Sequence, residues 1–493
     1  MDINSSAIVR VTGMVFSITG IAMIPAMLMS LYQGEFTAAF SFSVCAVPAV
    51  VAALVLRTLK KSGGAFDMRP GTAIPAAVLC LLVSSVTGAL PFLLCGTAQG
   101  FVDCLFESVS GFTTTGATVI HGINTLPNGI ILWRSISGWL GGLAVFVLVP
   151  GILSTTGERG LSTQSVHLTL FSDMKFHFSP SSMRKICLYY AFVTVFLLLL
   201  LLLSGLDIFS AVIRAMGTIS TSGFTEHSAL PPVPDSMFTN WILTVFMLIA
   251  AMNYTVFFRT RSRHWRSIIH DEEPRLFIMV FITASVLMAI GLVSSPVEAR
   301  QAEISSGGTG TILEQAFFQS AAAVSTTGFH IADYTNWPTF CHFIILFLMA
   351  VGGCTASAAG GYKTLRLLIV IKLIWRNISR KIHPNAVVPL KINNTPIPND
   401  ASNPLIGHGM LYAVVVSIAV LIITFSGSDI LTSVSSVISC MGNVGPAFGV
   451  AGPISDYSAF NPFAKILLSI IMIAGRLELA PLILIIPRFW KND

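Results

Sequence analysis

Four glycines at nearly equal intervals constrain this chain of 493 residues more than any other feature of its sequence. They are separated by 107, 105 and 117 residues, at Gly116, Gly223, Gly328 and Gly445. Each glycine ends a short polar stretch, and each stretch lies between two long apolar segments. Because self-similarity at a fixed period indicates repeated copies of one structural unit, we expect four related units.

The apolar segments are typical of a protein that spans a membrane. Hydrophobic residues make up 54% of the chain and charged residues 10%, with a mean hydropathy of +0.80, whereas soluble domains carry about 25% charged residues. The eight cysteines show no CxxC or metal-ligand spacing, so neither a disulfide framework nor a zinc site is expected. The sequence contains no catalytic triad, Walker motif or GxGxxG loop and does not indicate an enzyme.

We expect an all-α integral membrane protein with ten full spans, two at the N-terminus and two in each of four pseudo-symmetric pore units. The N-terminal spans are expected near 11–34 and 36–56. The first spans of the four units are expected near 72–96, 186–206, 275–295 and 408–427. Their second spans are expected near 129–153, 239–258, 338–375 and 461–487.

Between the two spans of each unit lies a short helix that ends at the polar loop. These helices are expected near 102–112, 207–219, 312–324 and 429–441. A full span needs about 20 residues, so we expect these helices to be re-entrant. The predicted domains are 1–71 for the two N-terminal helices, then 72–185, 186–274, 275–400 and 401–493 for the pore units.

The positions of Lys and Arg predict the orientation in the membrane. All but five of the 28 basic residues fall on one predicted face; the exceptions are Arg134, Arg214, Arg300, Lys465 and Arg476. Because basic loops stay in the cytoplasm, both termini are expected there, and the four glycine loops are expected to enter from the outside. The net charge of +6 follows this topology, so no nucleic-acid partner is expected.

The four glycine loops are predicted to form a cation-selectivity filter. Non-helical backbone persists within a bilayer only where it is buried in protein or lines water, and a ring of backbone carbonyls can replace the hydration shell of a monovalent cation. Glycine allows the backbone to turn carbonyls toward an axis, and the short helices point their negative C-terminal ends at the same place. The alternative is that Ser, Thr and Gly merely pack membrane helices, which four loops in register do not favour.

The predicted filter comprises the glycines and the three residues before each of them. These residues are Thr113, Thr114, Thr115, Gly116, Ser220, Thr221, Ser222, Gly223, Ser325, Thr326, Thr327, Gly328, Gly442, Asn443, Val444 and Gly445. The cation ligands are expected at Thr114, Thr115, Thr221, Ser222, Thr326, Thr327, Asn443 and Val444. The fourth loop departs from the Ser/Thr pattern of the other three.

A run of small residues from Gly352 to Gly361 interrupts the second span of the third unit, which at 338–375 is too long for one straight helix. The run predicts a flexible intramembrane loop that gates the pore below the filter; the alternative is a small-residue packing face. Lys363 is expected to anchor the loop at its cytoplasmic side. The predicted gate comprises Gly352, Gly353, Cys354, Ser357, Gly360, Gly361, Lys363 and Arg476.

Arg476 lies inside the last span, where an arginine costs about 2.5–3.5 kcal/mol on insertion scales. It should face water or an acidic partner, and its charge would oppose cation passage. Glu478 is a poor partner because residues two apart do not share a helix face; the alternative is an arginine that snorkels to the cytoplasmic end. Of the other polar residues, Asn253 should hydrogen-bond across helices, Arg134 should anchor an outer helix end, and His330 should be structural or solvent-facing.

Several segments together resemble the Trk/Ktr/HKT superfamily of potassium transporters, and most closely its bacterial TrkH/TrkG type. Besides the glycine loops, they are Trp133-Arg-Ser, Trp139-Leu-Gly-Gly142, Ala251-Met-Asn253, Gly352-Gly-Cys354 with Lys363, His383-Pro, Pro389-Leu-Lys391 and Gly475-Arg-Leu-Glu478. The resemblance implies a multi-pass protein of the bacterial cytoplasmic membrane, in contact with lipid, that forms a homodimer with one pore per protomer. It also implies a cytosolic, ring-forming RCK-type regulatory subunit that binds nucleotide, and no cofactor on this chain beyond K⁺.

The resemblance assigns roles to individual residues as well. Glycine at position 116 goes with potassium selectivity in the superfamily and serine with sodium selectivity, Arg476 matches the pore arginine, and 352–361 matches the gating loop. Two departures stand out. Ala356, Ala358 and Ala359 occupy positions where Gly, Thr and Gly are expected, and the 154–183 loop lacks the usual proline- and charge-rich character.

The leading hypothesis is potassium uptake through a gated pore, driven by the membrane potential. Within the same class, a sodium or non-selective route and a proton-coupled route stay open, although no acidic residue is placed mid-span by the sequence. A non-conducting receptor is the alternative from a different class, and four repeated filter-like loops would be superfluous for it.

Overall fold

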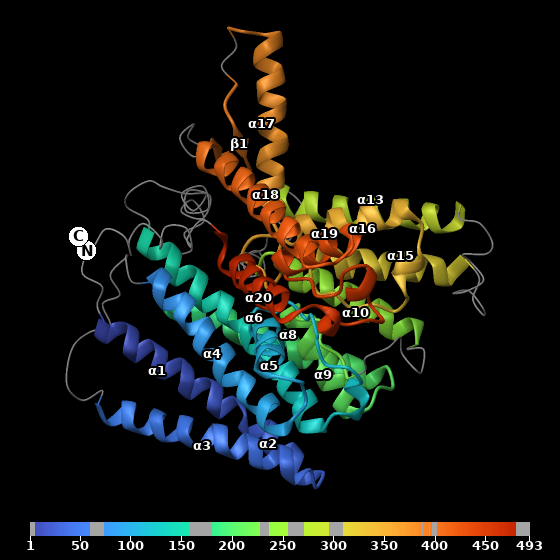
Figure 1. Ribbon diagram of the computed structural model, residues 1–493. Helices are drawn as coiled ribbons and strands as arrows, with labels where there is room; N and C mark the ends of the chain where they lie inside the picture. Colours follow the sequence, from blue (N-terminus) through green and yellow to red (C-terminus); the bar gives the residue numbers. More distant parts are fainter. Residues whose placement is uncertain are drawn as a thin grey trace.

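A computed structural model describes residues 5–59, 73–156, 180–226, 236–254, 271–294, 309–385, 388–393, 395–396 and 402–479. Most of the predicted basic loops, the end of the second unit's second span (255–258) and the C-terminal tail from 480 lie outside the described residues. The described part of the chain is mostly helical (Figure 1). It contains six helices long and apolar enough to cross a membrane, together with shorter apolar helices.

The N-terminal helices pack beside the first unit. They are α1 (Ser5–Ala22), α2 (Ile24–Tyr32) and α3 (Phe36–Leu59). The span expected near 11–34 corresponds to α1 and α2 taken together (Thr12–Tyr32), with a break at Met23. The break arises because Pro25, near the start of α2, has no backbone N–H to continue the ladder. These helices contact one another and the first unit.

Each of the four units has the predicted order of elements. The first helices of the units are α4 (Ala73–Cys95), α8 (Pro180–Leu203), α13 (Glu272–Ser294) and α18 (Ser402–Phe425). The short helices that precede the glycine loops are α5 (Phe101–Phe112), α9 (Ile208–Ser220), α15 (Thr309–Val324) and α19 (Ile430–Gly442). The second helices are α6 (Asn128–Thr156), α10 (Met237–Ala251), α16 (Thr339–Val351) with α17 (Thr364–Ile382), and α20 (Pro462–Leu477). The predicted all-α membrane architecture is confirmed.

Several second helices are shorter than their predicted spans. The helix α10 ends at Ala251 and α20 ends at Leu477. The spans were expected to run to 258 and 487, and their last residues (255–258 and 480–487) lie outside the described residues. Hydropathy continues past both points, but the backbone leaves the helix: Met252 is extended, and Glu478 has a positive φ of 65°. The count of ten full spans therefore stays a prediction, since α3, α10 and α16 each hold fewer than 18 suitable residues.

The third unit is broken as predicted. Its second span divides into α16 and α17, and the residues between them form an irregular segment, 352–363. The helix α17 projects from the body of the protein, and a short hairpin of β1 (Lys391–Ile392) and β2 (Thr395–Pro396) lies beside it (Figure 1). The strands are antiparallel, with Lys391 opposite Pro396. Leu390 and Ile392 bury their side chains against the first turns of α17.

Two apolar clusters flank the centre of the molecule. One joins residues of the second and third units, and the other joins the first and fourth units with the N-terminal helices. The short helices α5, α9, α15 and α19 contribute to these clusters and are largely buried at their C-terminal ends. Fully burying a large apolar side chain is worth about 1.5–3 kcal/mol relative to leaving it exposed to water. The two clusters hold the four glycine loops between them. Three-residue 3₁₀ turns follow the first loop (Ile123–Thr125) and the third loop (Tyr334–Asn336), and two such turns follow the fourth loop (Gly449–Ala451 and Tyr457–Ala459).

Candidate selectivity filter and gate

The four glycine loops share one backbone conformation. In each loop, the residue two before the glycine is left-handed although it is not glycine; these residues are Thr114 (φ 54°), Thr221 (57°), Thr326 (56°) and Asn443 (53°). The four glycines also have positive φ, at 78°, 66°, 73° and 108°. A left-handed non-glycine residue costs about 1–2 kcal/mol, so four of them at equivalent positions mark a conformation that the fold imposes. This fourfold repetition supports the equivalence predicted from the sequence.

The turn at the end of each short helix fixes the loops by a repeated hydrogen bond. The amide of the residue before the glycine donates to the carbonyl five residues back. These bonds run from Thr115 to Ser110 (2.8 Å), Ser222 to Gly217 (3.0 Å), Thr327 to Ala322 (3.0 Å) and Val444 to Ser439 (2.9 Å). This bond fixes the residue before each glycine in the same turn in all four loops.

The four loops close into a ring at the glycines. A Cβ atom on Gly116 would lie 2.1 Å from the carbonyl oxygen of Ser222, in the second loop. The same relation takes Gly223 to Thr327 (1.9 Å), Gly328 to Val444 (1.9 Å) and Gly445 to Thr115 (2.5 Å). Each glycine thus lies against the carbonyl that precedes the next glycine, in the cyclic order of the units. No side chain fits at these four positions, which gives the physical reason for the glycines.

Hydroxyl groups stiffen the first three loops in the same way. The side chains of the residues flanking the left-handed position are paired: Thr113 with Thr115 (2.8 Å), Ser220 with Ser222 (2.9 Å) and Ser325 with Thr327 (2.8 Å). All the hydroxyl residues of these loops are buried. The predicted oxygen-rich loops therefore lie together in the structure, although whether they bind K⁺ stays a prediction.

The fourth loop is built differently, as its sequence indicates. Gly442 and Val444 carry no hydroxyl, and Asn443 takes over, donating from Nδ2 to Thr115 Oγ1 (3.0 Å) and to the Met472 carbonyl (2.9 Å). The carbonyl of Gly445 accepts from the hydroxyls of Ser439 (2.8 Å) and Tyr457 (2.7 Å). Both lone pairs of the Gly445 carbonyl oxygen therefore have protein donors, so the protein holds this oxygen at the fourth loop.

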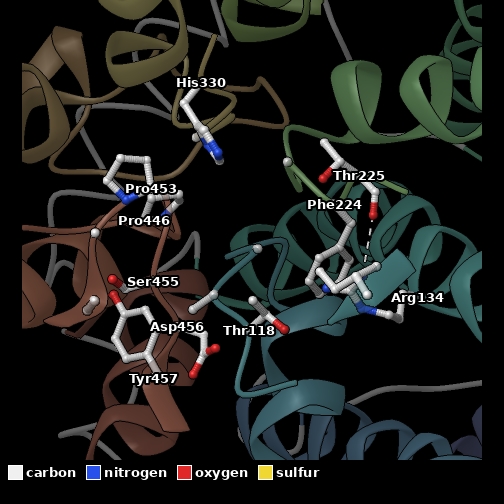
Figure 2. Close-up of a pocket in the computed structure, with 17 residues that line it drawn as sticks. Thr118, Arg134, Phe224, Thr225, His330, Pro446, Pro453, Ser455, Asp456 and Tyr457 are labelled. Atoms are coloured by element: carbon white, nitrogen blue, oxygen red, sulfur yellow. Dashed lines mark hydrogen bonds between the residues drawn. The ribbon is translucent and has the colours of Figure 1, made fainter. Parts of the chain in front are cut away.

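A cavity of about 50 Å³ lies against the ring, on the side where the residues that follow the glycines are found. It is lined by three of the filter glycines and by residues that follow them, including Thr118, Phe224, His330 and Pro446 (Figure 2). His330 and Asp456 reach it from opposite sides. His330 was expected to be structural or solvent-facing; it lines this cavity, and a role beyond that is not indicated.

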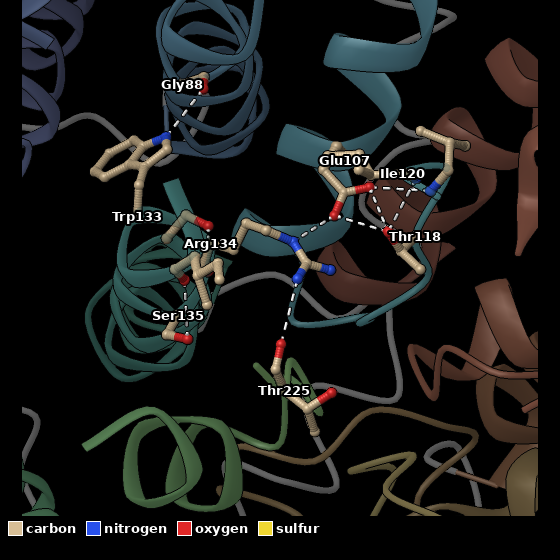
Figure 3. A network of polar contacts seen from close by, with 11 residues as sticks. Gly88, Glu107, Thr118, Ile120, Trp133, Arg134, Ser135 and Thr225 are labelled. Atoms are coloured by element: carbon tan, nitrogen blue, oxygen red, sulfur yellow. Dashed lines mark hydrogen bonds and ion pairs between the residues drawn. The ribbon is translucent and has the colours of Figure 1, made fainter. Parts of the chain in front are cut away.

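The cavity wall is braced by a buried ion pair that the sequence did not reveal. Arg134 Nε donates to Glu107 Oε1 (2.7 Å), with 1% and 0% of the two side chains exposed (Figure 3). Glu107 also accepts from the Thr118 hydroxyl (3.0 and 3.1 Å) and the Val119 amide (3.0 Å), and Arg134 covers the ring of Phe224 at 4.4 Å. Arg134 anchors the start of α6, and its contacts join the first two filter loops; that this helix end faces the outside stays a prediction.

Breaking this pair should destabilise the protein strongly. Removing one partner of a buried pair typically costs about 3–5 kcal/mol, because the other charge is left uncompensated. We expect Glu107→Gln to lower the melting temperature of the detergent-solubilised protein well below that of the wild type. As a matched control, Lys372→Met removes a partly exposed pair with Glu272 (28% and 33% exposed), and such pairs contribute about 0–1 kcal/mol. Equal shifts for the two variants would contradict the assignment.

The irregular segment 352–361 lies directly against the filter loops. The Ala358 carbonyl accepts from the Thr221 hydroxyl (3.1 Å), and the Gly360 amide donates to the Thr326 hydroxyl (2.7 Å). A Cβ on Gly360 would lie 2.2 Å from the Gly442 carbonyl oxygen. Through these contacts the segment touches the second, third and fourth loops. The predicted position of the segment next to the filter is therefore what the structure contains, while its movement as a gate stays a prediction.

Arg476 bridges this segment to the first unit. Its Nη1 donates to the Ala358 carbonyl (2.7 Å) and its Nη2 to the Gly141 carbonyl (3.4 Å), and the side chain is 7% exposed. The sequence led us to expect water or an acidic partner, and among the described residues the guanidinium instead bonds to backbone carbonyls. Glu478 was correctly excluded as its partner, because Glu478 pairs with Arg366 of α17.

The remaining predicted gate residues form the body of the segment. Cys354 donates its amide to the Ala251 carbonyl (2.9 Å), Ser357 donates to the Cys354 carbonyl (2.6 Å), and Lys363 bonds back to the Ala359 carbonyl. Lys363 therefore ties the segment to itself rather than anchoring it to a membrane surface. Gly352 and Gly361 have positive φ, and a Cβ on Gly353 would lie 2.5 Å from that of Ala359.

Alanine at position 356 adopts the conformation that a glycine would favour. Its φ is 54°, in the left-handed region, which costs a non-glycine residue about 1–2 kcal/mol. Sequence reasoning missed two residues that hold the segment, Thr355 and Thr364. Thr364 donates to the carbonyls of Gly352 and Gly353 at 3.2 Å; its hydroxyl beside a glycine run was the available signal.

Comparisons with known proteins agree with this geometry. The TrkH family model, described as "Cation transport protein", matches residues 48–489. Trk system potassium uptake protein TrkH from Escherichia coli (strain K12) is 32% identical over 496 residues, covering 99% of each chain. Trk system potassium uptake protein TrkG from the same organism is 28% identical over 497 residues, covering 98% of each. The crystal structure of the potassium transporter TrkH from Vibrio parahaemolyticus has a TM-score of 0.83 at 27% identity, covering 98% of this chain and 99% of that one.

Proposed function

Because this chain belongs to the TrkH family of cation transport proteins, we propose that it takes up potassium through a K⁺-selective pore centred on the four glycine loops. The observation that carries the proposal is the closed ring, in which each filter glycine lies against the carbonyl preceding the next. A ring of carbonyls replaces the hydration shell of a monovalent cation. The relatives named for potassium uptake cover almost the whole chain, which supports K⁺ as the ion.

The gate in this proposal is the segment 352–361. This segment is neither helix nor strand, lies against three of the four loops, and holds the Arg476 guanidinium beside them. A positive charge at that point raises the barrier to a cation that has passed the filter, by about 1–3 kcal/mol at an effective dielectric near 20. The pore is closed while the segment keeps these contacts and opens when the segment leaves them.

The proposal places α17 and its hairpin in the cytoplasm of a bacterium, with the filter loops entering from outside and both termini inside. A separate cytosolic, nucleotide-binding RCK-type subunit would control the gate, because the basic loops predicted from the sequence on that side are too short to fold as a nucleotide-binding domain. The protein would function as a homodimer with one pore in each protomer. The order of Lys and Arg along the chain supports the orientation.

Ion flux into proteoliposomes tests the proposal directly. With K⁺ or Na⁺ gradients at a set membrane voltage, we expect K⁺ flux that follows the voltage and exceeds Na⁺ flux at least about tenfold, a difference of about 1.4 kcal/mol in barrier height. Equal fluxes of the two ions would favour the non-selective alternative. Flux that stops when the proton gradient is removed, at constant voltage, would favour the proton-coupled alternative.

A further inference from the structure

The first turn of α13 reaches across to the gating segment. Glu273, the second residue of that helix, is 5% exposed, and both of its carboxylate oxygens accept hydrogen bonds from Thr355. Oε1 accepts from the Thr355 amide at 2.6 Å, and Oε2 accepts from the Thr355 hydroxyl at 2.9 Å. Thr355 is itself 3% exposed. A buried carboxylate thus takes two donors from a single residue of the segment.

The residues on either side of Thr355 are held by the end of α10. The Cys354 amide donates to the Ala251 carbonyl (2.9 Å), and the Ala356 carbonyl accepts from the Tyr254 amide (3.2 Å). Both of these are bonds between neutral backbone groups, which contribute less than bonds to an ionised group. Ala356 is also left-handed at φ 54°, so this part of the segment is strained and relies on its contacts.

The turn that carries Glu273 is fixed independently of the gating segment. Asn393, at the tip of the hairpin, donates to Asp271 Oδ1 (3.0 Å) and accepts from the Glu272 amide (3.0 Å). The ion pair of Lys372 with Glu272 is partly exposed (28% and 33%), and such pairs contribute little. The bonds of Asn393 to Asp271 and to the Glu272 amide therefore hold the start of α13 in place, and Glu273 can hold Thr355 against a fixed support.

We infer that Glu273 is a positioning residue of the gate, whose carboxylate latches Thr355 and keeps the segment 352–361 in the closed position. The inference rests on the proposed function, because it assigns the segment a closed and an open position. Leaving a buried carboxylate without its hydrogen-bond donors costs free energy. The segment therefore opens only when water solvates Glu273 or when another interaction of the segment offsets that cost. The latch thus contributes to the equilibrium between the closed and open positions of the segment. A regulatory partner can shift that equilibrium only by its differential affinity for the two positions.

Two substitutions with a matched control test this latch. Glu273→Gln keeps the size of the side chain but replaces one accepting oxygen by an amide donor, and Thr355→Val removes the hydroxyl donor at the other end. Glu272→Gln makes the same change of charge one residue away, where the partner is Lys372 rather than the gating segment. Because hydrogen bonds to an ionised group are stronger than those between neutral groups, we expect Glu273→Gln to raise K⁺ flux, without any partner protein, about tenfold or more.

The buried thiol of Cys354 gives a readout that does not depend on ion flux. It lies next to Thr355 and is 0% exposed, so its rate of maleimide labelling, measured on its peptide by mass spectrometry, reports how often the segment leaves. We expect labelling to rise in Glu273→Gln and Thr355→Val by the same factor as flux, and to change less than about twofold in Glu272→Gln. The double variant should exceed the stronger single variant by little, because both remove one contact.

Two outcomes would overturn the latch. One is a folded Glu273→Gln protein with wild-type flux and wild-type Cys354 labelling, and the other is an equal rise in Glu272→Gln. Should Glu273→Gln not fold, Thr355→Val decides, since it loses one hydroxyl. A wild-type protein that conducts no K⁺ would contradict the proposed function alone, because faster Cys354 labelling in the variants would still support the latch.

Discussion

Replacing Gly116 by serine is expected to lower the K⁺/Na⁺ permeability ratio by about tenfold or more. The residue has a φ of 78°, and a Cβ there would lie 2.1 Å from the Ser222 carbonyl oxygen and 3.1 Å from the carbonyl carbon. The neighbouring backbone must move to admit it, and that backbone belongs to the carbonyl ring. A left-handed serine adds about 1–2 kcal/mol of strain, which is of the order needed for a tenfold change in selectivity.

Reversal potentials under bi-ionic K⁺ and Na⁺ conditions measure this ratio. Gly96→Ser serves as the matched control, because Gly96 also has a positive φ, of 70°, but no atom lies within 4 Å of the position of its Cβ. We expect Gly96→Ser to keep the wild-type ratio while sharing the backbone strain. If Gly116→Ser kept that ratio as well, the first loop would not be part of the filter.

The repeated part of the site could be predicted from the sequence, because it depends on local patterns. A short amphipathic helix, a hydroxyl-rich turn and a glycine recur four times, and the observed helices end within one or two residues of where they were expected. The break after Val351 followed likewise from ten small residues in a row. These features are encoded within about 30 neighbouring residues, so each repeat confirms the others.

The contacts between repeats could not be predicted in this way. Asn443 bonds to Thr115, 328 residues earlier, and nothing local to either residue indicates that bond. The buried carboxylates were missed for a related reason. Glu107 lies in the short helix α5 and Glu273 in the first turn of α13, so both are outside the mid-span positions where an acidic residue attracts attention. Glu107 is buried against the loop that follows its own helix, and Glu273 is buried against the gating segment 82 residues away.

The early ends of α10 and α20, at Ala251 and Leu477, have a physical cause of their own. Hydropathy measures which residues tolerate an apolar environment and does not register where the backbone stops being helical. At Ala251 and Leu477 the apolar sequence continues while the helix ends, and at Ala251 the freed carbonyl accepts from Cys354 of the gating segment. The shortened helix therefore provides the acceptor that the irregular segment requires, in line with the need to satisfy every backbone group within a membrane.

Replacing Arg476 by alanine is expected to raise K⁺ flux about 10- to 100-fold without preventing folding. The substitution removes a charge beside the filter, worth about 1–3 kcal/mol at an effective dielectric near 20. It also removes the bonds that join the Ala358 carbonyl of the gating segment to Gly141 of α6. Both changes favour the open pore, the first by lowering the barrier to the cation and the second by freeing the segment.

Arg476→Lys separates the two contributions. Lysine keeps the charge but has no planar fork with which to reach two carbonyls at once, so we expect flux between that of the wild type and Arg476→Ala. Flux in Arg476→Lys equal to that in Arg476→Ala would assign the effect to the lost bridge, and flux equal to that of the wild type would assign it to the charge. A folded Arg476→Ala protein with wild-type flux would remove Arg476 from the gate. Poor membrane insertion with normal flux per inserted molecule would make the arginine structural.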